Sequence, residues 1–189
     1  YRFLEETGRL DNLRRAGGLK TGIPFQGRYY DDSDVYKWLE AVACTLATEP
    51  AADLAGMAAE AIAAIAAAQQ PDGYLNSYFA LERSGERWTN LRDQHELYCA
   101  GHLIQAAVAH HRATGSTVLL DVARRLADHI ATFFGPAPGL RPGTPGHPEI
   151  EMALVELSRT TGERRPLDLP PFSLDGRGQA LTGGRKNHR

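Results

Sequence analysis

The sequence is short of cysteine and of long apolar runs, and each shortage excludes a class of protein. Its 189 residues contain two cysteines, Cys44 and Cys99, and neither has the CxxC spacing of a zinc ribbon. A disulfide framework is therefore not indicated, and a reducing cytoplasm is the expected location. No apolar run reaches the roughly 18 residues that cross a membrane, so we expect no membrane partner.

The sequence also lacks an excess of charge of either sign. It has 21 Lys and Arg against 23 Asp and Glu, a formal net charge of -2. A protein that binds nucleic acid needs a basic surface, so no nucleic-acid partner is expected. A small-molecule ligand fits this composition better, whereas the oligomeric state is left open.

Alternating apolar and polar residues, the pattern of β-strands, are almost absent, with YLNSYF at 74–79 as the one candidate. Helical periodicity dominates instead, so the fold class is expected to be all-α. The expected helices cover about 32–48, 52–69, 93–113, 117–134 and 148–162. Caps and breakers bound them, including a Pro-Asp-Gly turn after the second and Gly135 after the fourth.

Three stretches with different composition divide the chain. Residues 1–30 are rich in glycine and are expected to form an irregular lead-in with one short helix. Residues 31–163 carry the helix pairs. Residues 164–189 begin with a segment broken by prolines and end in a polar, glycine-rich stretch that we expect to be a disordered tail.

Two segments repeat at an offset of 47 residues, which is a typical length for a helix pair. The repeat matches Gly115 to Gly162 and Asp121 to Asp168, and residues 33–69 form a looser earlier copy. One pair cannot bury both its faces, so pairs stack into an open solenoid or a closed ring of inner and outer helices.

The third helix carries an unusual set of side chains. It has no charged residue between Glu96 and Arg112, so it is expected to be an inner helix surrounded by protein. His95, Cys99 and His102 recur at one-turn spacing on a single face. They are either histidines buried against backbone carbonyls, a three-residue zinc site, or a polar stripe that lines a cavity.

A further histidine, His147, opens the next inner helix at the same end of the layer as His95. It either caps that helix or joins His95 at a pocket sized for a monosaccharide. Carboxylates are the other candidates for chemistry. We attribute Asp31, Asp32 and Asp34 to capping, and Glu96 either caps its helix or orients His95.

The motifs DSDVYKWLEA, QQPDGYLNSYF, RWTNLRDQHELYCAGHLIQAAVAHH and GHPEIEMALVELSRTTGE together closely resemble the N-terminal part of glycoside hydrolase family 127. These are bacterial beta-L-arabinofuranosidases, and the likeness runs from about Gly18 to Gly178. The resemblance implies an (α/α)6 toroid followed by β-sandwich domains. It also implies a cysteine nucleophile near zinc, a glutamate acid/base, and sugar hydroxyls contacted by the residues matching His95 and His147.

Much of that machinery has no counterpart in this chain. Cys44 and Cys99 match no zinc-cysteine motif, and the family's acid/base glutamate lies downstream of GHPE. We therefore assign no catalytic residue and no metal ligand, with zinc implied for the complete family enzyme only. Because about two and a half of six helix pairs are present, we expect a truncated or decayed copy that is inactive alone.

Two alternatives remain open. One is a sugar epimerase or isomerase on the same kind of toroid, in which His95 and His147 act as opposed acid and base. The other is a non-catalytic module of helical repeats.

Overall fold

The computed structural model describes residues 1–141 and 143–163, which form helices and connecting loops with no β-strand. This confirms the all-α prediction, and the YLNSYF segment is a loop that leads into a turn at 77–79. The elements are α1 (Arg2–Glu6), α2 (Arg9–Ala16), α3 (Asp32–Leu46), α4 (Ala52–Ala68), η1 (Ser84–Glu86), α5 (Glu96–Thr114), α6 (Val118–Phe133) and α7 (Glu149–Thr161). None of these helices is long and apolar enough to cross a membrane.

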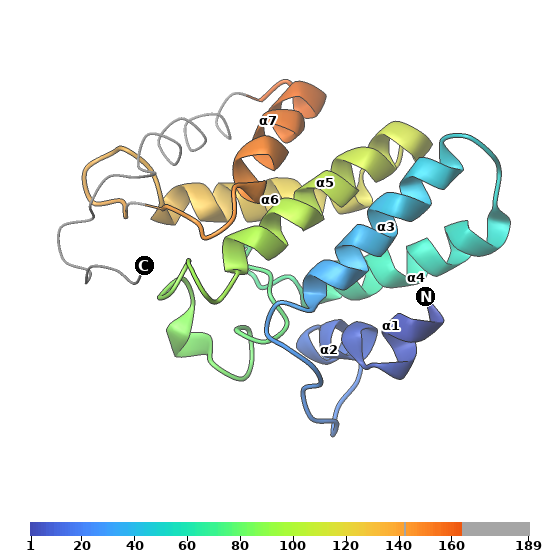
Figure 1. Cartoon of the computed structure of the whole chain (residues 1–189), viewed down its shortest axis with the longest axis horizontal. Helices are drawn as coiled ribbons and strands as arrows, with labels where there is room; N and C mark the ends of the chain where they lie inside the picture. Colours follow the sequence, from blue (N-terminus) through green and yellow to red (C-terminus); the bar gives the residue numbers. More distant parts are fainter. Residues whose placement is uncertain (142, 164–189) are drawn as a thin grey trace, which may run out of the picture.

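The helices form two layers, with α5 at the centre of one of them. In that layer α5 packs against α3 on one side and α7 on the other, and all three run in the same direction (Figure 1). The second layer contains α4 and α6, which pack against α3 and α5, while α2 covers α4 and α3. Parallel inner helices place their N-terminal ends at one end of the molecule.

Burial explains why α5 is the central helix. Its positions Leu103, Ile104, Ala106 and Ala107 are fully enclosed, and these side chains belong to the hydrophobic core. A helix without charged residues over this length can be stable only when several neighbours cover it. The prediction that this helix belongs to the inner layer agrees with its place between α3 and α7.

The 47-residue repeat is visible in the ends of the inner helices. Gly115 ends α5 and Gly162 ends α7, each in the left-handed conformation with φ 75°. Only glycine adopts this C-terminal geometry without strain, so the repeat marks two equivalent helix ends. The proline-broken segment and the expected tail lie outside the described residues.

Residues 1–30 contain more helix than their composition predicts. Two helices, α1 and α2, form where one was expected, and Gly8 separates them with φ 73°. Leu10 and Leu13 are spaced three apart and are fully buried. This short apolar stripe outweighs the nearby glycines, because burial on the body of the protein stabilises a helix that propensity alone would not.

The acidic start of α3 does not cap the helix as expected. The N-cap residue, Asp31, makes no side-chain capping hydrogen bond. Asp32 is buried and instead accepts hydrogen bonds from the backbone N–H and hydroxyl of Ser77. Asp31 accepts from the N–H of Arg28 and pairs with Arg9 at 3.1 Å. These two carboxylates therefore bind groups outside the helix in place of its own first amides, and they tie the loops at 28 and 77 to α3.

Gly101 allows α5 and α7 to approach closely. A Cβ at this position would lie 2.6 Å from Cγ of Glu149 and 3.0 Å from the backbone N of Ile150. We expect Gly101→Ala to lower the free energy of unfolding by roughly 1–3 kcal/mol through overpacking.

Gly56, in the exposed interior of α4, is the matched control because nothing lies within 4 Å of its added Cβ. Gly56→Ala should raise stability by about 0.5–1 kcal/mol. Urea unfolding of both variants measures the contrast. Equal stabilisation by both substitutions would show that α5 and α7 are not in close contact at Gly101.

Candidate functional site

His95 lies just before α5 and not on its helical face. It is the N-cap residue and adopts a left-handed backbone with φ 59°. The predicted arc of His95, Cys99 and His102 is therefore wrong, because helical spacing does not extend to a residue outside the helix. Within α5 the partly exposed stripe contains Tyr98 and His102, whereas Cys99 is 1% exposed.

Two histidines and two tyrosines gather at the N-terminal end of the inner helices. The ring centroids of His95 and His147 are 4.8 Å apart, at a steep angle of 80°. The ring of Tyr98 lies 5.1 Å from His147, and Tyr30 stacks on His95 at 5.0 Å. The sequence placed His95 and His147 at the same end of the layer, and the structure brings them together.

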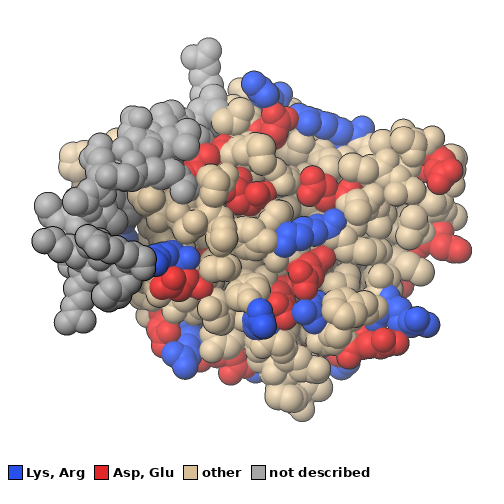
Figure 2. Space-filling view, in the orientation of Figure 1, with Lys and Arg blue, Asp and Glu red and all other residues tan. Residues whose placement is uncertain are grey.

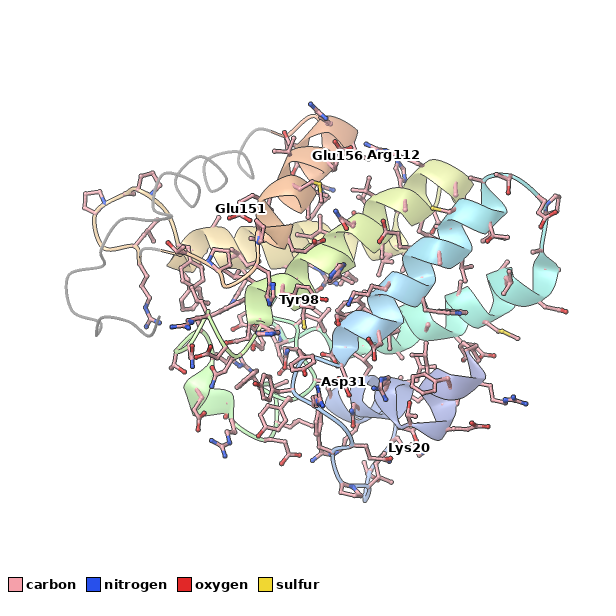
Figure 3. The ribbon with its side chains drawn as sticks, viewed as in Figure 1. Lys20, Asp31, Tyr98, Arg112, Glu151 and Glu156 are labelled. Atoms are coloured by element: carbon pink, nitrogen blue, oxygen red, sulfur yellow. The ribbon has the colours of Figure 1, made fainter. Side chains whose placement is uncertain are left out.

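Three helices contribute to this end of the layer. Figure 3 labels Asp31, Tyr98 and Glu151, which mark the N-terminal ends of α3, α5 and α7. Lys37 of α3 donates a 2.5 Å hydrogen bond to the hydroxyl of Tyr98. This bond orients the tyrosine, whose ring is close to both His147 and His102. We call His95, His147, Tyr98 and His102 the histidine cluster.

Burial and neighbouring charge lower the pKa of two imidazoles of the cluster, those of His95 and His102. Desolvation and the proximity of His147 lower the pKa of His95. The pKa of His102 is lowered to about 4 by desolvation, followed by Lys37 and His147. At neutral pH His102 therefore offers one donor and one acceptor nitrogen instead of a positive charge.

Several polar atoms around the cluster are buried without a partner in the described part of the chain. They are Nδ1 of His95, Nδ1 of His102 and Oε1 of Glu149. His102 Nδ1 and Glu149 Oε1 are 3.4 Å apart and do not form a hydrogen bond. Burial, with Glu40 as the next cause, raises the pKa of Glu149. Unpaired buried polar atoms are costly, and their convergence is typical of a site that binds a polar ligand.

The three-residue zinc reading is not supported by these positions. Cys99 points toward α3 and donates its S–H to the carbonyl oxygen of Tyr30 at 3.4 Å. Over residues 1–141 and 143–163 no group of three or more His, Cys, Asp or Glu side chains could hold a metal ion. The residues described here thus do not fit the zinc that the family resemblance implies.

Three members of this region were not predicted as site residues: Tyr98, Tyr30 and Glu149. Tyr98 lies one helical turn before His102, and Glu149 lies two residues after His147. Their spacing could have identified Tyr98 and Glu149. No local pattern points to Tyr30, which reaches His95 through tertiary structure alone.

Two hollows of about 310 Å³ each are present among the described residues. One begins beside the histidine cluster, at Asp93 and Gln94, and has an aromatic side formed by Tyr29, Tyr78 and Phe79. The other lies against α6, around His129. Neither is lined by His95 or His147. Figure 2 shows acidic and basic side chains interspersed over the visible face, without a large area of one sign.

Comparison with known proteins shows the family to which the chain belongs. Residues 2–187 match the family described as "Beta-L-arabinofuranosidase, GH127 catalytic domain". The chain is 43% identical over 173 residues to a non-reducing end beta-L-arabinofuranosidase of Bifidobacterium longum subsp. longum. These findings define a glycoside hydrolase catalytic domain. The chain belongs to glycoside hydrolase family 127, as its motifs predicted.

Solved structures agree with this assignment. The crystal structure of a GH127 beta-L-arabinofuranosidase from Geobacillus stearothermophilus T6 is 48% identical, with a TM-score of 0.88 over 93% of this chain. A second GH127 beta-arabinofuranosidase is 37% identical, with a TM-score of 0.86 over 94% of this chain. The chain spans about a quarter of the length of these relatives: 26% of the Bifidobacterium protein, 27% and 29% of the two structures.

The lowered pKa of His102 predicts how stability depends on pH. Above pH 6.5 the imidazole is neutral in the folded and unfolded chains. Between pH 6.5 and 4 the unfolded chain binds a proton that the folded chain does not, so His102 favours unfolding as the pH falls. The full effect is at most roughly 3 kcal/mol.

Urea unfolding of the chain and its His102→Gln variant at pH 7.0, 5.5 and 4.5 measures this effect. The free energy of unfolding of the unmodified chain, relative to the variant, should fall as the pH falls. A difference that stays constant across the range would contradict the neutral state of His102.

Proposed function

We propose that this chain forms one wall of the sugar-binding site of a beta-L-arabinofuranosidase. In this proposal His95 and His147 bind hydroxyl groups of a beta-L-arabinofuranoside or a closely related sugar. The observation that carries it is the meeting of the two imidazoles, 4.8 Å apart, at the N-terminal end of the inner helices in a chain of this family.

The chemistry of the histidine cluster suits a sugar. A neutral imidazole has one donor and one acceptor nitrogen, and a sugar hydroxyl can satisfy both kinds of group. Nδ1 of His95 is buried without a partner, so a hydroxyl bound there would remove a desolvation cost. The rings of Tyr98 and Tyr30 supply apolar faces against which the C–H groups of a furanose can pack.

The spacing of His95 and His147 favours a site in which both contact the sugar from one side. It does not favour an epimerase site. An epimerase that uses opposed acid and base needs the sugar ring between them. Contact on each face of that ring requires about 3.5–4 Å, so the imidazoles would lie roughly 7 Å apart or more. Centroids at 4.8 Å with edge-to-face geometry leave no such space.

We propose that catalytic groups come from outside the described residues. Hydrolysis through a covalent intermediate requires a nucleophile and an acid/base. Burial raises the pKa of the Cys99 thiol well above its usual value, so it stays protonated. Glu96 is tied to Tyr74 and Trp88 by hydrogen bonds.

The hollow beside the histidine cluster could hold the rest of the glycoside in this proposal. Its aromatic side and its polar residues Asn90 and Gln94 are the groups that sugar sites commonly use. A bacterial origin is supported by the named Bifidobacterium and Geobacillus relatives. A cytoplasmic location is supported by the free thiols of Cys44 and Cys99.

Sugar binding tests the proposal directly. We expect methyl beta-L-arabinofuranoside to perturb NMR signals at the N-terminal end of α5 in the isotopically labelled 189-residue chain. His147→Ala and His95→Asn should each weaken binding about five- to tenfold through lost hydrogen bonds. Asparagine is chosen at position 95 because it tolerates a left-handed backbone.

His111→Gln, at the far end of the same helix, is the matched control and should leave affinity unchanged. Perturbations confined to the far end of α5 would contradict the proposed site, as would an equal loss of affinity in the control.

The chain alone should not hydrolyse the sugar. Incubation of the purified chain with an aryl beta-L-arabinofuranoside and zinc is expected to release no phenol above the rate without protein, because a nucleophile and an acid/base each contribute orders of magnitude. Turnover that disappears in Cys99→Ala or Glu96→Gln would contradict this expectation.

A further inference from the structure

Two residues other than glycine have a left-handed backbone in the described part of the chain, and both flank one loop. They are Trp88, with φ 60°, and His95, with φ 59°. Large side chains avoid this conformation, so it persists only where surrounding contacts impose it. The loop between them leads directly into α5.

The carboxylate of Glu96 links the two ends of this loop. Its Oε2 accepts a 2.8 Å hydrogen bond from the backbone N–H of Trp88, and its Oε1 accepts a 2.5 Å bond from the hydroxyl of Tyr74. Glu96 is 2% exposed and follows His95 directly. The buried side chain of Glu96 thus joins the start of the loop, at Trp88, to its end, next to His95.

The far end of the loop is itself anchored to the outer layer. The indole N–H of Trp88 donates to Nε2 of His129 on α6 at 3.3 Å. Nδ1 of His129 lies 2.8 Å from the carbonyl oxygen of Asp72, to which it donates. The position of Trp88 is therefore fixed, and the hydrogen bond from its backbone N–H to Glu96 transmits that position to the start of α5.

We propose that Glu96 is a positioning residue, which holds His95 in its left-handed conformation and so directs the imidazole toward the sugar. That His95 binds a sugar rests on the proposed function. That Glu96 holds the backbone of His95 does not. Glu96 acts through the backbone and does not touch the sugar. Its effect depends on accepting the Trp88 N–H bond and not on its charge.

The positioning role of Glu96 does not require the negative charge that an ion pair would need, because the side chain is buried. Burial raises the pKa of Glu96 to about 7, above the usual range for a carboxyl group. Helix capping, the alternative for Glu96, is wrong because no side-chain capping bond forms at the start of α5. The hydrogen bond between Tyr74 and Glu96 serves as the control for the bond between Trp88 and Glu96. It belongs to the same network but does not involve the loop.

Three variants of the full chain separate positioning from stability. In Glu96→Gln the amide oxygen still accepts from Trp88, and the amide N–H can donate to the Tyr74 oxygen. Glu96→Leu has similar bulk but no acceptor, so the Trp88 N–H is left unpaired. Tyr74→Phe removes one hydrogen bond and leaves the Trp88 bond intact.

The readouts are the side-chain ¹H–¹⁵N signals of His95 and the affinity for methyl beta-L-arabinofuranoside. Glu96→Leu should displace the His95 signals and weaken binding about tenfold or more. Glu96→Gln should restore both to within about twofold, and Tyr74→Phe should lower the thermal midpoint while leaving the His95 signals in place. An unchanged His95 signal in Glu96→Leu would overturn the proposal, as would a Tyr74→Phe variant that shifts His95 equally.

If the Glu96→Leu variant does not fold, amide hydrogen exchange in the unmodified chain still tests the proposal. In the unmodified chain the Trp88 amide should exchange at least a hundredfold more slowly than that of exposed Arg92. Equal exchange rates would overturn the proposal. If the unmodified chain binds no sugar, the proposed function fails, while the His95 signals and the Trp88 amide still report on positioning.

Discussion

The fold depends on covering α5 from three directions. This helix has no charged side chain between its first and last turns, so it must be enclosed, and α3, α7 and α6 supply the cover. A close approach occurs at Gly101, which faces the backbone at the start of α7. Because α3, α5 and α7 all run in one direction, this single packing requirement also decides which loops meet at one end.

The histidine cluster follows from that arrangement. His95 and His147 each precede an inner helix, and the parallel direction of α5 and α7 brings them within 4.8 Å. Desolvation lowers the pKa of the imidazoles of His95 and His102, so these two present donors and acceptors in place of positive charge. Lys37 is the nearby cation, and its bond to the Tyr98 hydroxyl fixes the ring that is close to both His147 and His102.

The sequence carried most of the fold and part of the site. The glycines at 115 and 162 and the apolar periodicity predicted the inner helices, because these signals depend on local backbone geometry. His95 and His147 could be paired because each opens an inner helix. The left-handed backbone of His95, its stacking on Tyr30 and the bonds of Glu96 could not be predicted. They arise from contacts between segments 8 to 65 residues apart, which no local pattern encodes.

The shared direction of the inner helices has an electrostatic consequence for the charge of a ligand that could bind at this end of the protein. Helix N-termini carry partial positive charge, and three of them would attract an anion. Each first turn, however, contains carboxylates: Asp32 and Asp34 in α3, Glu96 in α5, and Glu149 and Glu151 in α7. These acidic groups offset the dipoles. An anionic ligand would bring its charge against these acidic side chains, whereas a neutral ligand, such as the proposed sugar, would not.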